Sequence, residues 1–188
     1  MKILIVDKNP AVVAALVAVG LDAVEGDILE HPAEAIVSPA NSFGFMDGGI
    51  DLVYSEHFGW HVQAFVQTKI MQHYSGELLV GQALSVETSD KDFPYLISAP
   101  TMRVPMAIPD PNHVRLATRA AISEAIKIGA SSVVMPGMGA GSGQVRPEWV
   151  ACMMKAGIED ACRPKTFPKS LNVASAHHWA VQPEASPQ

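Results

Sequence analysis

The residues best suited to chemistry in this chain of 188 residues lie in two glycine-rich loops. The first loop follows a short apolar run at 35–37, contains Gly44, Gly48 and Gly49, and precedes a segment that could form two helical turns. A glycine loop between a strand and a helix exposes backbone N–H groups beside the positive end of the helix dipole. Such an arrangement binds phosphate, so we expect an anionic ligand at this loop.

Polar side chains surround the first glycine loop. Asn41, Asp47 and Asp51 stand on either side of its glycines and could hydrogen-bond sugar hydroxyls or hold a water molecule. A phosphate-binding loop with sugar-binding groups beside it predicts a nucleotide-type ligand.

The second glycine-rich loop, Pro136 to Gly143, follows a buried apolar run at 131–135 and precedes a helix beginning at Pro147. No frame of it satisfies G-x-G-x-x-G, and the chain contains no G-x-x-x-x-G-K-[ST], so neither a Rossmann dinucleotide site nor a P-loop is predicted. One such loop could be only a tight turn. Two loops, each between a buried strand and a helix, favour a ligand site.

Other chemistries find less support in the residue pattern. His57 and His61 are spaced i, i+4, but the glutamate of H-E-x-x-H is missing, and we predict neither a metal nor a cofactor. Ser42 and Ser142 lie in loops without a G-x-S-x-G elbow, which argues against a serine hydrolase.

Alternating strands and helices must position these loops. They predict a three-layer α/β/α sandwich with a mixed, largely parallel central sheet, in which ligands bind at the carboxyl ends of the strands. The expected strands are 2–6, 21–28, 35–37, 82–88, 95–99 and 131–135, and the expected helices are 11–19, 50–57, 60–74, 113–128 and 147–161.

Several local features refine this prediction. Asn9 and Asn112 are expected to cap helices, and the four-proline segment 100–112 is expected to form a loop over the site. Cys152 and Cys162, ten positions apart on one helix, would lie roughly 15 Å apart, too far for a disulfide. Residues 172–179 are expected to add an edge strand, and disorder is expected from Gln182 onward.

Composition limits the class of protein. With 48% hydrophobic and 17% charged residues, the chain is expected to form one ordered domain. A formal charge of −6 argues against nonspecific nucleic-acid binding. The longest apolar stretch, 11–19, is too short to span a bilayer, and the N-terminus has no signal-peptide pattern, so a soluble, cytoplasmic protein with no membrane partner is predicted. Its oligomeric state stays open.

Three short motifs carry a family resemblance. Gly26-Asp27-Ile28, then AIVSPANS at 35–42, then Gly48-Gly49-Ile50-Asp51 resemble the macro domain, a family that writes G-D-I, A-I-V-N-A-A-N-S and a glycine run followed by V-D. The spacing also agrees, with fourteen residues from Asp27 to Asn41 and ten from Asn41 to Asp51. Residues 97–100 and 133–141 resemble later strands of the family. The resemblance implies a macro-like domain over 1–162 and a proline-containing extension over 163–188, the latter partly disordered.

The resemblance also implies a ligand and its contacts. The family binds ADP-ribose, and some members hydrolyse ADP-ribosyl bonds. Asp27, with the Ile28 N–H nearby, would recognise the adenine amino group, and Asn41 would contact the distal ribose. Asp51 would orient a water, which makes Asp51 and Asn41 the candidate catalytic residues. Gly48, Gly49 and Ile50 would bind one phosphate, and Gly139, Ala140, Gly141, Ser142 and Gly143 the other.

Four positions depart from the family pattern. Asp47 stands where hydrolytic members often have a glycine, Ser38 followed by Pro39 replaces the first asparagine, and Tyr54 replaces a histidine found in many members. The second loop has Ser142-Gly143-Gln144 where an aromatic residue often covers the distal ribose.

Three functions are compatible with these residues. The protein could bind ADP-ribose or an ADP-ribosylated macromolecule, or it could hydrolyse the ADP-ribosyl bond with Asp51 or, as a weaker candidate, Glu56. The third possibility, from another class, is a macro-like scaffold with a degenerate pocket. The two intact glycine loops argue against it.

Overall fold

A six-stranded sheet with the order β2-β1-β6-β3-β5-β4 forms the centre of the computed structural model, which describes residues 1–163 and 167–180. All neighbouring strands are parallel except β4 and β5, which are antiparallel. The predicted mixed, largely parallel sheet is therefore confirmed. Its strands are β1 (Lys2–Asp7), β2 (Ala23–Glu25), β3 (Ala35–Ser38), β4 (Leu84–Glu87), β5 (Tyr95–Ser98) and β6 (Ser132–Met135).

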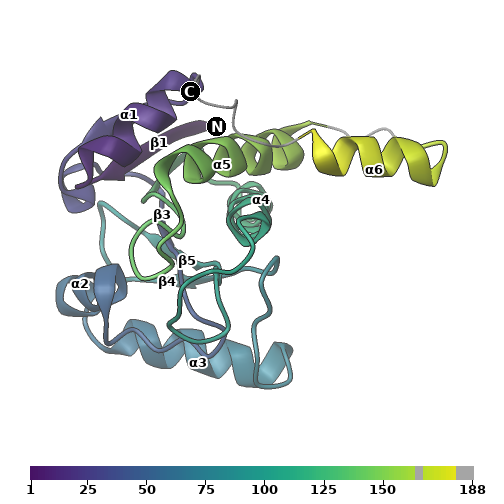
Figure 1. The fold of residues 1–188 in the computed structure, drawn as a ribbon. Coiled ribbons are helices and arrows are strands. Elements are labelled where there is room, and N and C mark those ends of the chain that lie inside the picture. The colour runs from purple at the N-terminus through teal and green to yellow at the C-terminus, as the bar shows by residue number, and fades with distance from the viewer. Residues whose placement is uncertain (164–166, 181–188) are drawn as a thin grey trace.

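Helices cover both faces of the sheet, as the three-layer prediction requires (Figure 1). One face packs against α1 (Pro10–Ala18), α4 (Asn112–Lys127) and α5 (Pro147–Cys162), and the other against α2 (Gly49–Phe58) and α3 (His61–His73). Because side chains alternate along a strand, Val37 of β3 enters the first core and Ile36 the second. The described helices also include the short 3₁₀ helix η1 (Ile28–Glu30) and α6 (Leu171–Trp179).

The predicted edge strand at 172–179 is wrong, because this segment forms α6. The Ser170 side chain accepts a hydrogen bond from the Val173 N–H and caps the helix, which stabilises its first turn. Figure 1 shows α6 beyond the end of α5, away from the sheet. The disorder predicted from Gln182 onward lies outside the described residues.

The two predicted helix caps have different outcomes. Asn9 caps α1 as expected, and its Oδ1 accepts from the Ala11 N–H at 3.0 Å. Asn112 is instead the first residue of α4, and its own N–H donates to Asp110 Oδ1 at 2.9 Å. Asp110, two residues upstream, therefore satisfies an N–H at the start of this helix.

Strand β4 is more buried than expected, because the alternation of Ser85 and Glu87 with Leu84 and Val86 predicts a strand with one face in solvent. Ser85, on the face expected to meet solvent, is buried because α4 packs there, and its hydroxyl donates to Glu124 Oε1 at 2.9 Å. Cys152 and Cys162 both lie on α5 as free thiols, as expected. Within the described ranges, no helix combines the length and the apolar character needed to cross a bilayer.

Candidate ligand-binding site

A cleft lies at the carboxyl ends of the parallel strands and is made of two adjoining cavities. The loop cavity, about 350 Å³, is lined by both glycine-rich loops, and the Asp27 cavity, about 260 Å³, is lined by Asp27 and Ile28. The two cavities meet at four residues that line both of them, and these are Asp7, Gly49, Ile50 and Pro136. An elongated ligand could therefore lie across both.

Asp27 is held in place at the end of β2. Its Oδ1 accepts from the Leu29 N–H at 3.1 Å and so caps η1, while Oδ2 accepts from Lys8 Nζ at 2.8 Å. The bond from the Lys8 ammonium, followed by that from the Leu29 N–H, lowers the pKa of the Asp27 carboxyl. Asp27 is thus an ionised hydrogen-bond acceptor at neutral pH on the wall of its cavity.

The N-terminus of α2 forms one wall of the loop cavity. Gly48 is the N-cap, and Gly49 has φ +58°, a left-handed conformation that favours glycine. The first N–H groups of a helix have no acceptor within the helix and carry its positive dipole end. This wall is suited to an anion.

The loop at 136–143 forms the opposite wall. The N–H groups of Gly141, Ser142 and Gly143 donate to no protein acceptor in the described part of the chain. The Gly143 carbonyl accepts from the Ile108 N–H at 2.8 Å, which holds the 100–112 loop against this wall. The 100–112 loop also contributes Thr101, Met102 and Pro105 to the cavity lining, in agreement with its predicted position.

Asn41 shapes the first loop from within. Its Oδ1 accepts from the N–H groups of Phe43 and Phe45 at 3.1 and 3.3 Å, and its Nδ2 donates to the Phe45 carbonyl at 2.8 Å. Asn41 also forms a β-bridge with Met102. Its amide therefore organises the rim of the cavity that it lines.

Asp51 is a buried carboxyl group on the wall of the loop cavity. It lies in the first turn of α2, and its Oδ1 accepts from Ser38 Oγ at 2.5 Å. Burial disfavours the charged form and raises the pKa of Asp51 to about 7, although the Ser38 hydrogen bond acts in the opposite direction. The group can therefore exchange a proton near neutral pH.

Tyr54 follows Asp51 by one helical turn, which predicts that both side chains point at the same place, but Tyr54 does not line the cleft. The side chain is fully buried in the core beneath α2, and its hydroxyl donates to the Val37 carbonyl at 3.1 Å. Burial raises the pKa of this phenol further above its usual value, so a role as a base is excluded.

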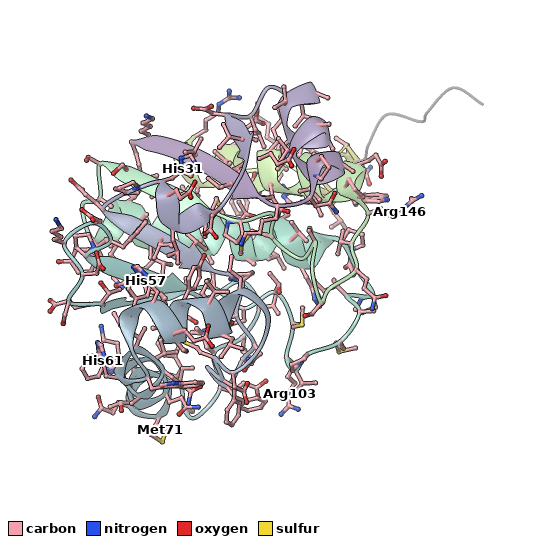
Figure 2. The ribbon with its side chains drawn as sticks, turned by 90° about the vertical axis from the view of Figure 1, so that its left-hand side faces the viewer. His31, His57, His61, Met71, Arg103 and Arg146 are labelled. Atoms are coloured by element: carbon pink, nitrogen blue, oxygen red, sulfur yellow. The ribbon has the colours of Figure 1, made fainter. Side chains whose placement is uncertain are left out.

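His57 lies on α2 and His61 on α3, both at one side of the molecule (Figure 2). Each histidine has its own partner. His57 Nε2 lies 3.4 Å from Asp90 Oδ2, and His61 Nε2 lies 3.3 Å from the Thr88 carbonyl. Across residues 1–163 and 167–180, no cluster of three potential metal ligands occurs.

The structure brings the predicted ligand-binding residues and the catalytic candidates Asn41 and Asp51 onto the walls of the cleft, whereas the weaker candidate Glu56 lines neither cavity. Asp27 and Ile28 line the Asp27 cavity, Gly49 and Ile50 line both, and the loop cavity takes the rest: Asn41, Gly48, Asp51, Gly139, Ala140, Gly141, Ser142 and Gly143. The functional contacts assigned to them stay predictions.

Among the lining residues that sequence reasoning missed are Asp7, Lys8 and Phe45. Asp7 lies at the junction of the two cavities, and its Oδ2 accepts from the Gly137 N–H at 3.0 Å. Its position at the carboxyl end of β1 was the signal that could have identified it. For Phe45, no signal distinguishes an exposed phenylalanine from a core one before the fold is known.

Comparison with known proteins is consistent with this geometry. The sequence model of the Macro domain matches residues 37–154, more than half of the chain. An uncharacterized protein of Aquifex aeolicus is 33% identical over 159 residues, which cover 83% of this chain and 93% of the relative. The chain belongs to the macro domain family, whose members bind ADP-ribose.

Solved structures agree on the fold. The macrodomain of Mycobacterium tuberculosis DarG superposes with a TM-score of 0.62 at 23% identity, covering 71% of this chain and 86% of that one. Thermosipho africanus DarTG in complex with ADP-ribose gives a TM-score of 0.60 at 20% identity, covering 75% of this chain and 39% of that one. These similarities establish the α/β/α macrodomain fold.

Proposed function

We propose that this domain binds ADP-ribose, free or attached to a macromolecule, along the two joined cavities. The observation that carries the proposal is the cleft itself, which has a fixed carboxylate at one end and N–H-rich glycine loops on both walls of its middle. The structurally similar Thermosipho africanus DarTG is in complex with ADP-ribose, which supports the choice of ligand.

Each part of the ligand has a matching part of the cleft. The Asp27 cavity takes adenine, and the Asp27 carboxylate accepts from the amino group of the base. The diphosphate lies between the start of α2 and the 139–143 loop, where unpaired N–H groups can bind its oxygens. The distal ribose then lies beside Asn41 and Asp51.

Isothermal titration with free ADP-ribose tests the proposal, and binding of micromolar affinity is expected. Asp27→Ala should weaken binding by about 1–3 kcal/mol, because a charged acceptor of the adenine amino group is lost. Glu25→Ala is the matched control, since Glu25 is an exposed acid on β2 outside both cavities. No heat and no thermal stabilisation with wild type would refute the proposal and favour a scaffold with a degenerate pocket.

Asp51 supports hydrolysis of an ADP-ribosyl bond as a second candidate activity. A general base works best when its pKa is near the operating pH, and burial raises the pKa of Asp51 to about 7 on the wall next to the predicted distal ribose. Glu56 is exposed on α2 and lines neither cavity, so Asp51 is the better candidate.

Release of ADP-ribose from a modified protein tests this activity. Asp51→Asn should slow release by about 10²–10⁴-fold if Asp51 is the general base, whereas Glu56→Gln should release at the wild-type rate. Equal rates for wild type and Asp51→Asn would remove Asp51 from the mechanism. No release by wild type would leave a binding module.

A further inference from the structure

Part of the loop cavity is apolar. Phe45, Met102 and Pro105 line the loop cavity but not the Asp27 cavity. They come from two loops that the Asn41–Met102 bridge and a hydrogen bond from the Ser42 N–H to the Arg103 carbonyl, 3.1 Å, hold together. These residues therefore form an apolar wall in the same cavity as Asn41, which is paired with Met102, and Asp51.

Phe45 is part of this apolar wall, although the residue is not buried. The residue is 53% exposed, while Met46 next to it is 2% exposed and packs in the core. Both backbone groups of Phe45 are bound by the Asn41 side chain, so the protein fixes an exposed aromatic residue at the mouth of the cleft. Large exposed apolar groups gathered at a cavity mouth mark an interaction site.

The titratable side chains that line the same cavity are all acidic in the described chain. Its titratable lining residues in the described chain are Asp7, Asp47 and Asp51, and none of the described lining residues is Lys, Arg or His. Asp47, which departs from the family pattern, is an exposed residue of this cavity and follows Phe45 by two positions in the chain. The N–H groups of the two glycine loops are available to the diphosphate, and a cationic group elsewhere on the ligand would be attracted to these acidic side chains.

Neighbouring arginines do not neutralise the cavity. Arg103 forms an ion pair with Glu77 at 2.8 Å, and its guanidinium lies 5.0 Å from the centroid of the Phe43 ring. Arg146 points outward at the right edge of Figure 2, and neither arginine lines the cavity. A cationic group of the ligand would therefore meet no positively charged side chain among the described lining residues of this cavity.

We propose that the cleft prefers ADP-ribose whose distal ribose carries a planar cationic group, which stacks on Phe45 beside Asp47. The proposal rests on the proposed function and names its ligand class. An aromatic face attracts a cation through its quadrupole, and a carboxylate beside it adds to the attraction. Two chemical sources carry such a group: the pyridinium ring of oxidised nicotinamide adenine dinucleotide and the guanidinium of an ADP-ribosylated arginine.

Oxidised and reduced nicotinamide adenine dinucleotide are a matched pair for the test, because the reduced ring is similar in size but neutral. We expect the oxidised form to bind about two- to thirtyfold more tightly, the range of a cation–π contact from exposed to desolvated sites. A peptide ADP-ribosylated on arginine should likewise bind more tightly than the same peptide ADP-ribosylated on serine. Of these two comparisons, the one with the larger ratio of cationic to neutral ligand affinity identifies the source of the cation.

Two variants locate the preference at the apolar wall. Phe45→Leu and Asp47→Asn should each bring the ratio of the affinities for the cationic and the neutral ligand toward one. The matched controls Phe65→Leu and Asp22→Asn change an exposed residue of the same type outside both cavities and should keep the wild-type ratio.

The outcomes separate the inference from the proposed function. If ADP-ribose binds but the cationic and neutral ligands bind equally in both arms, the inference is wrong and the proposed function stands. A preference that survives in both Phe45→Leu and Asp47→Asn would also overturn it. If none of the ligands binds, the proposed function fails and the inference fails with it.

Discussion

At the scale of single residues, the buried pair of Ser38 and Asp51 is the feature most specific to this chain. Ser38 replaces the first asparagine of the family motif, and its hydroxyl donates to Asp51 at 2.5 Å inside the protein. A carboxyl group that is nine-tenths or more buried with one short hydrogen bond is destabilised when it ionises. The protein therefore gains stability when Asp51 is protonated.

The first prediction is a pH dependence of stability. The pKa of Asp51 in the folded state, about 7, lies above its unfolded value of about 3.9, so its contribution is complete below about pH 4 and is lost as the pH rises to about 7. Urea unfolding between pH 5 and 8 should show wild type losing about 1.4 kcal/mol per pH unit relative to Asp51→Asn up to about pH 7, and no further above it.

A variant of the partner provides the control. Ser38→Ala removes the hydrogen bond that lowers the pKa of Asp51, so the pH window should move upward. Parallel pH profiles for wild type and Asp51→Asn would show that Asp51 ionises in the folded state as easily as in the unfolded chain.

The second prediction concerns the loop that Asn41 organises. Asn41→Ala removes three hydrogen bonds to Phe43 and Phe45, and we expect a loss of about 1–3 kcal/mol in the free energy of unfolding. Denaturant unfolding measures the loss. Gln67→Ala, which removes a single 3.4 Å bond to the Phe43 carbonyl, should cost less. Equal stability of wild type and Asn41→Ala would contradict a structural role of the Asn41 side chain and leave only a role in ligand contact.

At the scale of elements, two glycines of the 136–143 loop tolerate side chains differently. A side chain at Gly139 would meet Val114 and Ile108 at 2.8 and 3.0 Å, and the backbone there has φ +78°. At Gly141, a side chain would meet nothing within 4 Å, and no left-handed backbone is required. Gly141 therefore offers a way to fill the phosphate region without disturbing the fold.

The third prediction uses this difference. Gly141→Glu should abolish measurable ADP-ribose binding, because the new carboxylate competes for the N–H groups and repels the diphosphate. Gly141→Gln, of similar size but neutral, should bind more tightly than Gly141→Glu, and both should keep the wild-type circular dichroism spectrum. Near wild-type affinity of Gly141→Glu would place the ligand elsewhere.

At the scale of the whole molecule, two hydrophobic cores on opposite faces of the sheet hold the cleft in place. The buried members of both cores lie between Ile5 and Met154, and the partly buried residues packed against them extend only to Ala161. Helix α6 lies beyond this region, with Leu171 81% exposed. The helices and strands that build the cleft thus all precede Arg163.

The fourth prediction is that residues 1–162 fold and bind without the rest of the chain. A protein truncated after Cys162 should keep its ADP-ribose affinity and melt within about 2 °C of the full chain, because none of the described residues after Cys162 belongs to either core. Differential scanning calorimetry and isothermal titration measure both quantities. Loss of solubility or of binding in the truncated protein would assign the 163–188 segment a structural role.

Local patterns in the sequence determined most of the architecture. Apolar runs and the glycines that end them predicted the six strands and five of the helices, since periodicity reports which face of an element is buried. The two glycine-rich loops and Gly26-Asp27-Ile28, which each follow an expected strand, located the cleft, because loops at the carboxyl ends of parallel strands converge in space.

Only the tertiary structure decided which partner each polar group has. Asp7 accepts from Gly137, 130 positions away, and Ser85 finds Glu124 on a helix that covers a face expected to meet solvent. Tyr54 has the helical spacing of a site residue but donates to a backbone carbonyl in the core. A buried polar group must find a hydrogen-bond partner, and that partner is supplied by packing between distant segments, which no local pattern encodes.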